Sequence, residues 1–372
     1  MIGDHPLNLA ATGLALNAYM LTGEEKYRNW LLEYAGAWKE RTLACGGKIP
    51  TNVGLDGKPG GVYNGQWWKG TYGWNFTIYD GEIERIAHRN YSHAGSWPGF
   101  GNALLASGDQ GWTDLLRRQM DLIYEQKKVE NGRVLLPQMY GDPRGYRYNG
   151  PPQWYHYTEN LFIDRLTEIY LRSMDRRDLE RIPKTGWIGF LEGREPDYPV
   201  RALRQELAAV RRKVEAIRGD TTTPDTRLAD YLLDLNPVRT DELVKLMWGG
   251  YFAGRIWMLH SRFRYFDPAQ RRAGLPPDVG ALVEKLAADS AALVLVNLNP
   301  IEARTVIVQA GGYGEHQFDE AELGERRIPI GGPLVTARLA PGCGGRIAFR
   351  MTRYKNRPTL AHPWDRGWFG GS

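Results

Sequence analysis

The first part of the chain carries apolar residues at helical spacing. Leu7, Ala10, Leu14, Ala18 and Leu21 recur every three or four residues, which predicts an amphipathic helix over residues 5–21. The sequence Thr-Gly-Glu-Glu at 22–25 has the spacing of a capping box, so a second helix is expected directly after it. The pattern therefore predicts a helical hairpin at the start of the chain.

The same hairpin pattern recurs further along. Residues 17–27 line up with residues 102–112, and a weaker third copy runs from Tyr155 to Leu171. One hairpin cannot bury its apolar face alone, so repeated hairpins are expected to stack on one another in an arc or a closed ring. Two further helices are predicted, a charged one over 198–218 and an apolar one over 240–263.

In the last third of the chain the pattern changes its period. Apolar or alternating runs between Gly and Pro turns predict strands at 291–298, 304–309, 326–330, 334–339 and 346–351. We therefore expect two domains, a helical-hairpin domain over residues 1–270 and a small antiparallel β-sandwich with an irregular tail over residues 271–372. A chain of 372 residues is long enough to form two cores.

The aromatic composition adds a candidate contact surface. The chain has 13 Trp and 20 Tyr but only 10 Phe, and Tyr and Trp favour half-exposed contacts because each joins an apolar ring to a polar group. Many of them lie in two long connections, residues 43–80 and 131–155. Long ordered connections usually carry function, and stacking on sugar rings is one such use.

Charge and cysteine content exclude several classes of function. The net charge of +5 comes from 48 basic and 43 acidic residues that are interleaved, so no nucleic-acid partner is expected, and the small basic excess favours an anionic ligand. No run of about 20 apolar residues predicts a membrane span. Two distant cysteines exclude a disulfide framework. No metal-binding motif occurs, so no cofactor is expected, although a divalent cation remains compatible with the His, Asp and Glu content.

The start of the chain also bears on localisation. No signal peptide precedes the first predicted helix, which begins almost at Met1. We expect that the chain is a trimmed or later part of a longer protein, and that the full-length protein acts outside the cytoplasm. The oligomeric state is left open by the sequence.

Helical hairpins with aromatic connections, followed by a β-sandwich, resemble the (α/α)-toroid carbohydrate-active enzymes, which include toroid polysaccharide lyases and six-hairpin glycosidases. The repeated segments 17–27 and 102–112 carry this resemblance. It implies a mainly α fold. Only three or four hairpins are legible, so either the ring is incomplete or further hairpins lie upstream of Met1. No catalytic signature of a single family is present.

The histidines suggest where the chemistry lies. His5 and His156 occupy equivalent positions of their predicted repeats, and His93 lies one helical turn past the matching position. Helix N-termini carry free N–H groups and suit anionic substrates, so an active centre is expected at these helix mouths, near 72–93 and 154–160.

The first hypothesis is β-elimination at a uronate of an acidic polysaccharide. This reaction needs a group that neutralises the carboxylate, a base for the C5 proton and an acid for the leaving oxygen. The candidate catalytic residues are His93, His156, Tyr91, Tyr157, Asn75 and Arg89, with Asn75 and Arg89 as neutralising groups. The candidate substrate-binding residues are Trp67, Trp68, Tyr72, Trp74, Trp154, Tyr155 and Glu159.

Two other hypotheses stay open. A glycoside hydrolase would need two carboxylates beside the bond, for which Asp80, Glu82 and Glu159 are candidates. A non-catalytic glycan-binding or scaffold protein would use the aromatic surface alone.

Overall fold

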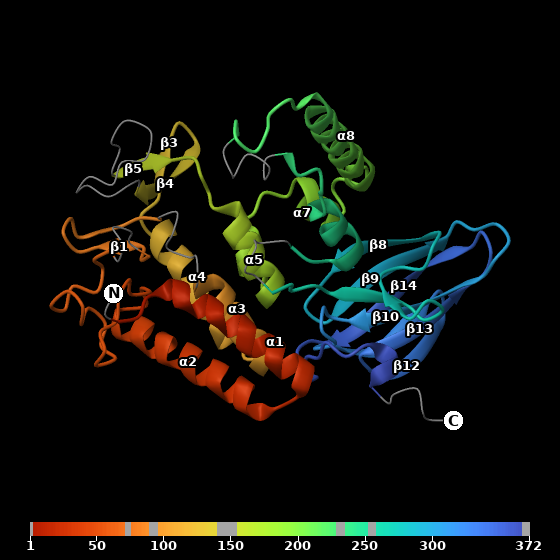
Figure 1. Ribbon diagram of the computed structural model, residues 1–372, viewed down its shortest axis with the longest axis horizontal. Coiled ribbons are helices and arrows are strands. Elements are labelled where there is room, and N and C mark those ends of the chain that lie inside the picture. The colour runs from red at the N-terminus through yellow and green to blue at the C-terminus, as the bar shows by residue number, and fades with distance from the viewer. Residues whose placement is uncertain are drawn as a thin grey trace.

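The computed structural model describes residues 3–70, 76–88, 96–139, 155–227, 235–251 and 258–366. Figure 1 shows a helical part on one side of the molecule and β-sheets on the other. The helices are η1 (Pro6–Ala11), α1 (Thr12–Thr22), α2 (Glu25–Ala44), α3 (Ser96–Ser107), α4 (Gly111–Tyr124), α5 (Ile163–Ser173), α6 (Arg176–Glu180), α7 (Gly186–Leu191), α8 (Tyr198–Gly219), α10 (Asp241–Leu243), the π-helical turn η2 (Val244–Trp248) and η3 (Pro363–Asp365). None of the described helices has the length and apolar character needed to cross a membrane.

The first two hairpins share one turn geometry. The Thr22 hydroxyl donates to the carbonyl of Ala18 and accepts the N–H of Glu24, and the Ser107 hydroxyl makes the same two contacts one repeat later. Gly23 and Gly108 follow with φ of 75° and 74°, the left-handed conformation that glycine adopts without strain. The hydroxyls therefore complete the turns between α1 and α2 and between α3 and α4, although neither caps the N3 amide as a capping box would.

Helix α3 is the centre of the helical part, because all its residues from Ser96 to Ala106 are buried. Two glycines allow this close packing. A Cβ at Gly99 would lie 2.7 Å from Cβ of Leu9, and a Cβ at Gly101 would lie 2.8 Å from the guanidinium of Arg172. Helices η1 and α5 can therefore approach α3 without a side chain between them.

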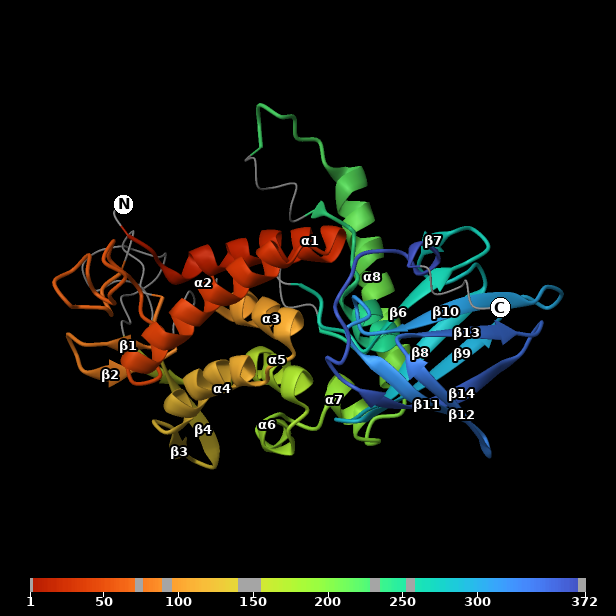
Figure 2. The same ribbon diagram turned by 90° about the horizontal axis from the view of Figure 1, so that it is seen from below.

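Two antiparallel sheets form the sandwich, and Figure 2 shows them as two layers. One sheet has the order β13-β10-β6-β7 and the other β12-β11-β14-β9-β8. Phe263 of the first sheet packs against Phe318 and Phe349 of the second, with ring centroids 6.1 and 5.7 Å apart. The strands are β6 (Phe263–Asp267), β7 (Arg272–Ala273), β8 (Val279–Leu286), β9 (Ser290–Asn297), β10 (Arg304–Ala310), β11 (Gln317–Leu323), β12 (Arg326–Gly332), β13 (Leu334–Leu339) and β14 (Gly344–Thr352).

Two small antiparallel sheets lie at the far end of the helical part. They are the pair β1 (Tyr79–Asp80) and β2 (Arg85–Ile86), and the three-stranded sheet of β3 (Lys128–Glu130), β4 (Arg133–Met139) and β5 (Tyr155–Thr158). Both belong to the connections between hairpins, so these connections are partly built as sheet.

The expectation of a mainly α fold of the (α/α)-toroid type is wrong. About 25% of the described residues are in strands, and the described helices form no toroid. One segment contributes to this error. The predicted helix over 240–263 shortens in its described part to α10 and η2, because Gly249 turns the chain with φ of 61°. The last residue of the predicted helix, Phe263, begins β6, because apolar residues alone do not distinguish a helix from a strand.

The end of β14 and the segment after it tie the sandwich to the helical part. The Arg353 guanidinium donates to the carbonyls of Arg172 (2.8 Å) and Ser173 (2.7 Å), the last residues of α5. Further on, the Leu360 N–H donates to the carbonyl of Met20 at 3.0 Å, and Arg357 donates to the carbonyl of Gly23. We call residues 353–360 the C-terminal strap, since they close over the end of α5 and the first hairpin turn.

Candidate functional site

The glycine-rich connection after α2 is fixed to the start of the helical part. Asp4 and Val53 form an antiparallel bridge in which each N–H donates to the other's carbonyl at 2.8 Å. The side-chain amide of Asn52, which is 1% exposed, donates to the carbonyls of Gln66 and Lys69, both at 3.2 Å. The two tryptophans between these anchor points are therefore held in place by the backbone.

Trp67 and Trp68 pack mainly on their own neighbours. Their rings meet edge to face with centroids 5.7 Å apart, and Trp67 also stacks on Tyr79 at 5.4 Å. Trp68 lies directly over Gly81, where an added Cβ would be 2.3 Å from the indole. Both tryptophans are half-buried, so they build the β1–β2 end of the molecule and offer only part of their surface to a ligand.

Tyr155 and Tyr157 lie on one face of β5, each with a basic group at its ring. The Arg85 guanidinium is 4.8 Å from the Tyr155 ring centroid, and the Lys128 ammonium is 4.0 Å from that of Tyr157. The two tyrosine rings meet edge to face at 6.0 Å. We call these four residues the tyrosine face. Its tyrosines are half-buried and its basic residues are exposed, which suits a ligand with both a flat ring and a negative charge.

Burial changes the proton affinity of one of these tyrosines. It raises the pKa of Tyr155 to about 12, with the hydroxyl of Tyr157 as a second cause. The Tyr155 hydroxyl also lies 3.4 Å from the carbonyl of Ile86, to which it donates. Tyr155 is therefore protonated at neutral pH and is suited to give a proton rather than to take one.

His156 points to the opposite face of β5 from the two tyrosines, because side chains alternate along a strand. Its neighbour across the ladder is Gln138 of β4, and Gln138 in turn forms a parallel bridge with His88. These three residues therefore line one face of the sheet. The Nδ1 atom of His156 is buried and has no hydrogen-bond partner in the described part of the chain.

His88 is a deeply buried member of this row. Its ring stacks on Phe162, the residue before α5, with centroids 3.9 Å apart. Burial, and then the charge of Arg165, lower its pKa to about 3, so the imidazole is neutral over the physiological range. His88 thus joins the small sheet to the first turn of α5.

The first turn of α5 carries charged groups toward the helical core. The Arg165 guanidinium lies 5.4 Å from the ring of Trp97, and it pairs with Glu168 at 2.9 Å. Glu168 also binds Arg172 at 2.6 Å, and both of these side chains are almost fully buried. On the same turn, Asp164 accepts a hydrogen bond from Tyr251. The pKa of Tyr251 is raised first by burial and second by this hydrogen bond.

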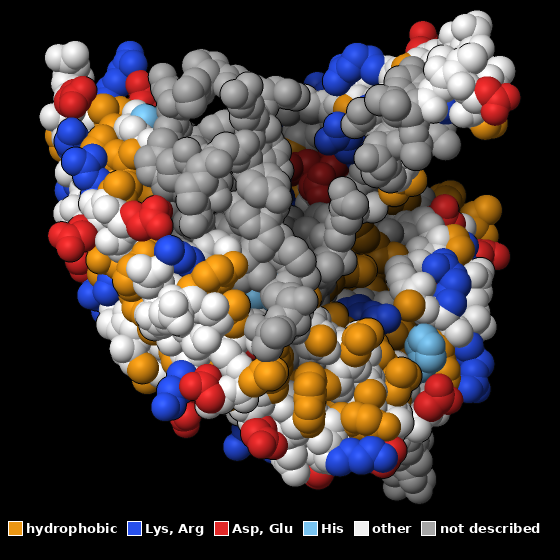
Figure 3. All heavy atoms as spheres, turned by 60° about the vertical axis from the view of Figure 1, so that its left-hand side comes forward, with side chains coloured by type: hydrophobic (Ala, Val, Ile, Leu, Met, Phe, Trp, Pro, Cys, Tyr) orange, Lys and Arg blue, Asp and Glu red, His pale blue; other side chains and the backbone are white. Residues whose placement is uncertain are grey.

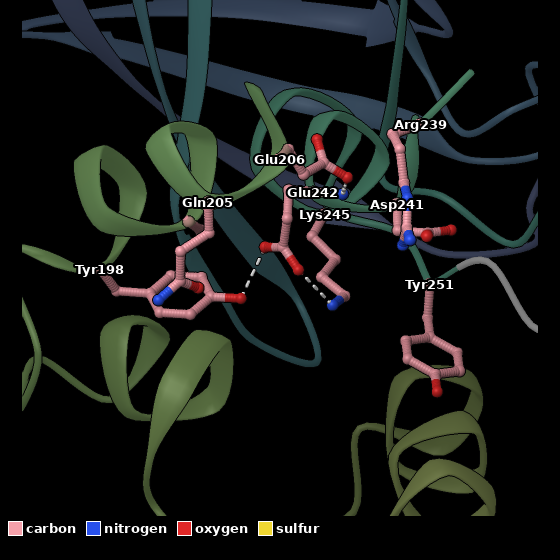
Figure 4. Close-up of a pocket in the computed structure, with 9 residues that line it drawn as sticks. Tyr198, Gln205, Glu206, Arg239, Asp241, Glu242, Lys245 and Tyr251 are labelled. Atoms are coloured by element: carbon pink, nitrogen blue, oxygen red, sulfur yellow. Dashed lines mark hydrogen bonds and ion pairs between the residues drawn. The ribbon is translucent and has the colours of Figure 1, made fainter. Parts of the chain in front are cut away.

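Tyr251 belongs to a cavity of about 430 Å³ between α8 and α10. Figure 4 shows the side chains that line it. Glu242 accepts hydrogen bonds from Tyr198 (2.6 Å) and Lys245 (2.7 Å), while Glu206 accepts the backbone N–H of Glu242 at 3.1 Å. Burial raises the pKa of Tyr198, and Glu242 raises it further. These contacts hold α8 against α10 and give the Glu242 carboxylate two hydrogen-bond donors.

The carboxylates predicted for a hydrolase have structural contacts. Asp80 is buried and accepts the N–H of Glu82 at 2.8 Å, and Glu82 lies 3.8 Å from Lys69. Glu159 is exposed and pairs with Arg133 at 2.6 Å. Acidic and basic side chains are interleaved over the face shown in Figure 3. Within the described residues, no group of three or more His, Cys, Asp or Glu could hold a metal ion.

Several predicted residues lie outside the described residues. They are Tyr72, Trp74, Asn75, Arg89, Tyr91, His93 and Trp154. Of the others, Tyr155 and Tyr157 share a face and His156 faces away from them. The equivalence of His5 and His156 is wrong, because His5 precedes η1 whereas His156 lies on a strand.

The sequence interpretation missed Arg85, Lys128, Gln138 and the role of His88. One signal was present for the sheet that holds them. Asn131-Gly132, with φ of 50° and 76°, forms the turn between β3 and β4, and this dipeptide between alternating runs is typical of a tight hairpin. No comparable signal marks Arg85 or His88, since their partners come from distant connections.

The comparisons with known proteins give one match. The model of a family described as a domain of unknown function (DUF8034) matches residues 1–183 and 168–244. No curated protein matches the chain. No solved structure matches it either.

Proposed function

For a chain that belongs to the DUF8034 family of unknown function, we propose binding of an acidic, uronate-containing polysaccharide at the tyrosine face and its cleavage by β-elimination. The observation that carries this proposal is the pairing of Tyr155 with Arg85 and of Tyr157 with Lys128. A half-exposed ring provides a stacking surface for a sugar, and a basic group beside it can bind the uronate carboxylate.

The proposed reaction uses side chains of this one face. Arg85 and Lys128 hold the uronate carboxylate, which stabilises the negative charge that develops when the C5 proton leaves. Tyr157 is the proposed base that takes that proton, the C5 electrons form the C4=C5 double bond, and the C4–O bond breaks with its electron pair on the leaving oxygen. Tyr155, which is protonated at neutral pH, gives its proton to that oxygen. His156 faces the other side of the strand and has no step in this scheme.

The first experiment measures polymer binding and the cleavage products in the same samples. The protein is incubated with a panel of polyuronates, and the ultraviolet absorbance of the new C4=C5 bond is followed beside a reducing-end assay. Absorbance with reducing ends supports elimination. Reducing ends without absorbance would contradict it and indicate hydrolysis. Retained binding without either product would leave a glycan-binding protein, and no binding at all would overturn the whole proposal.

Substitutions then test the assignment of roles. Tyr157→Phe keeps the ring but removes the hydroxyl, so turnover should fall at least ~100-fold while polymer binding changes little. Lys128→Met should weaken binding. Arg133→Met is the matched control, because Arg133 lies on the same hairpin and its partner is the carboxylate of Glu159. Full turnover in Tyr157→Phe together with its loss in His156→Ala would move the chemistry to the histidine face.

A further inference from the structure

The sandwich has a cavity of about 470 Å³ between its two sheets. The cavity lies at the end away from the C-terminal strap, because β14 runs from Gly344 at the cavity to Thr352 next to the strap. Its lining comes from the strands β9, β11, β12, β13 and β14 and from the turn between β13 and β14. The walls are mainly aliphatic, with side chains such as Leu295, Ile330 and Ile347.

Small side chains leave this space open. Two facing sheets lie about 10 Å apart, and side chains from their inner faces normally fill that distance. Near the strap the rings of Phe263, Phe318 and Phe349 do so. At the cavity, β11 and β13 contribute Ala321 and Ala337, whose methyl groups are too short to reach across. The sequence therefore leaves one half of the sandwich core unfilled.

The cavity opens to solvent beside two strand edges. Among the described strands, β12 is the last of one sheet and β13 the last of the other. Two apolar residues of the lining reach solvent here, since Leu323 is 42% exposed and Ile328 is 48% exposed. The β12 edge is a poor partner for another strand, because Pro329 has no N–H to donate and Arg327 adds an exposed charge. The opening therefore suits a small ligand better than a β-strand.

The lining indicates the chemistry of that ligand. It contains no aromatic side chain among the described residues, so it offers an aliphatic chain close contact but offers a sugar no ring to stack on. Arg338 is the one charged residue of this lining, and its side chain has no ion pair in the described part of the chain. A guanidinium binds a carboxylate through two parallel N–H···O hydrogen bonds. The cavity thus combines an apolar interior with a single cationic group.

We propose that the sandwich binds one fatty acid, with its chain between the sheets and its carboxylate at Arg338. An apolar cavity of about 150 Å³ holds one benzene ring, so a cavity of about 470 Å³ has room for on the order of 15 carbon atoms. Burial of the chain supplies the affinity, and the guanidinium sets its direction. The proposal is independent of the proposed function, since the tyrosine face belongs to the small sheets at the far end of the helical part.

Calorimetric titration of the full chain with dodecanoate tests the ligand class. One equivalent should bind, with the negative heat-capacity change that accompanies burial of apolar surface. Each methylene removed from the chain should weaken binding about fourfold, because less apolar surface leaves water. Dodecyltrimethylammonium, which has the same chain and a cationic end, should bind more weakly than dodecanoate. Absence of binding, or an affinity that does not depend on chain length, overturns the proposal.

Two substitutions test the location of the ligand. Ala337→Phe fills the cavity with a ring, so dodecanoate binding should be lost. Ala288→Phe is the matched control, because Ala288 is an exposed alanine in the turn between β8 and β9 of the same sandwich and should leave binding intact. Arg338→Met should weaken dodecanoate binding about tenfold and leave dodecanol binding unchanged. Unaltered dodecanoate binding in both Ala337→Phe and Arg338→Met would place the ligand elsewhere and overturn the proposal.

The thiol of Cys343 gives a test that needs no substitution. Cys343 is exposed and lines the cavity, whereas Cys45 is buried. Saturating dodecanoate should slow the alkylation of Cys343 by iodoacetamide, a neutral reagent, at least about tenfold, because the bound chain covers the thiol. An unchanged rate at saturation would contradict the proposed position. Sedimentation velocity covers the other occupant, since a dimer that Ala337→Phe dissociates, without dodecanoate binding, would assign the opening to a second copy of this chain and overturn the proposal.

Discussion

Aromatic residues in an irregular connection show what a sequence can and cannot predict about single side chains. The glycine-rich segment pointed to Trp67 and Trp68 as a ligand surface, since no helical period assigned them to a core. In the structure each packs against an aromatic neighbour or a glycine, and both are half-buried. Their neighbours Tyr79 and Gly81 come from a strand pair that the sequence interpretation did not include, so the contacts themselves were not predictable.

The fit of Trp68 over Gly81 gives a residue-scale prediction. Gly81→Ala should destabilise the protein by about 1–3 kcal/mol, because the new Cβ would overlap the indole and force the connection to move. Gly36→Ala is the control. Gly36 lies within α2 with nothing near its Cβ position, so alanine there should be neutral or stabilising by up to about 1 kcal/mol. Urea denaturation of both variants measures the difference, and an equal effect of the two would exclude the packing argument.

Helices and strands long enough to show several periods of the apolar pattern were predictable from the sequence, and short elements were not. The helices of the first two hairpins and the strands β9, β10, β12, β13 and β14 lie where their apolar patterns place them. The segment Tyr155–Thr158 was read as the start of a third hairpin, yet it is a strand. Four residues are too few to separate a two-residue period from a helical one, and the pairing with β4 decides the outcome.

The contact of Arg353 with α5 allows a prediction at the scale of elements. Arg353→Lys should destabilise the protein by ~1–3 kcal/mol, because lysine cannot satisfy the carbonyls of Arg172 and Ser173 with the planar fork of arginine. Arg350→Lys, on the exposed side of β14, should change the free energy of unfolding by less than about 0.5 kcal/mol. Thermal unfolding followed by circular dichroism compares them. Identical midpoints would show that the cap of α5 contributes nothing.

Across the whole molecule, ionisable groups are concentrated where the sandwich meets the helical part. Arg172 of α5 lies against Gly101 and near His260, while Arg262, Glu315, His316 and Arg353 come from the β-sheet side. Burial lowers the pKa of Arg262 to about 9 and raises that of Glu315 to about 7. A sequence gives no sign of such a junction, since its members are up to about two hundred residues apart and each looks like an ordinary surface charge.

These groups predict the pH dependence of stability. Burial lowers the pKa of His88, His260 and His316. Below pH 6.5 these three imidazoles therefore bind protons in the unfolded chain but stay neutral in the native state. The contribution of these histidines to the stability of the native state is complete above pH 6.5 and is lost as the pH falls. Glu315 acts in the opposite sense, because its raised pKa favours the native state at low pH and costs stability as the pH rises from 4.5 to about 7.

Three histidines outweigh one glutamate, so the free energy of unfolding should rise with pH between 4.5 and 6.5. Glu315→Gln removes the opposing contribution, and the rise should become steeper by up to about 1.4 kcal/mol per pH unit. Urea titrations at a series of pH values measure both slopes. An unchanged slope in Glu315→Gln would mean that this carboxyl titrates alike in the folded and unfolded chains.

The C-terminal strap has a consequence for the order in which the protein matures on the ribosome. The hairpin turn at Gly23 is translated early, yet its carbonyl is bound by Arg357, which is added 334 residues later. In the same way, the carbonyl of Met20 gains its hydrogen bond only after Leu360 has been translated, and the carbonyls at the end of α5 gain theirs only after Arg353 has been translated. The contacts that the strap makes with the first hairpin turn and with the end of α5 can therefore form only after the strands β6 to β14 have been translated.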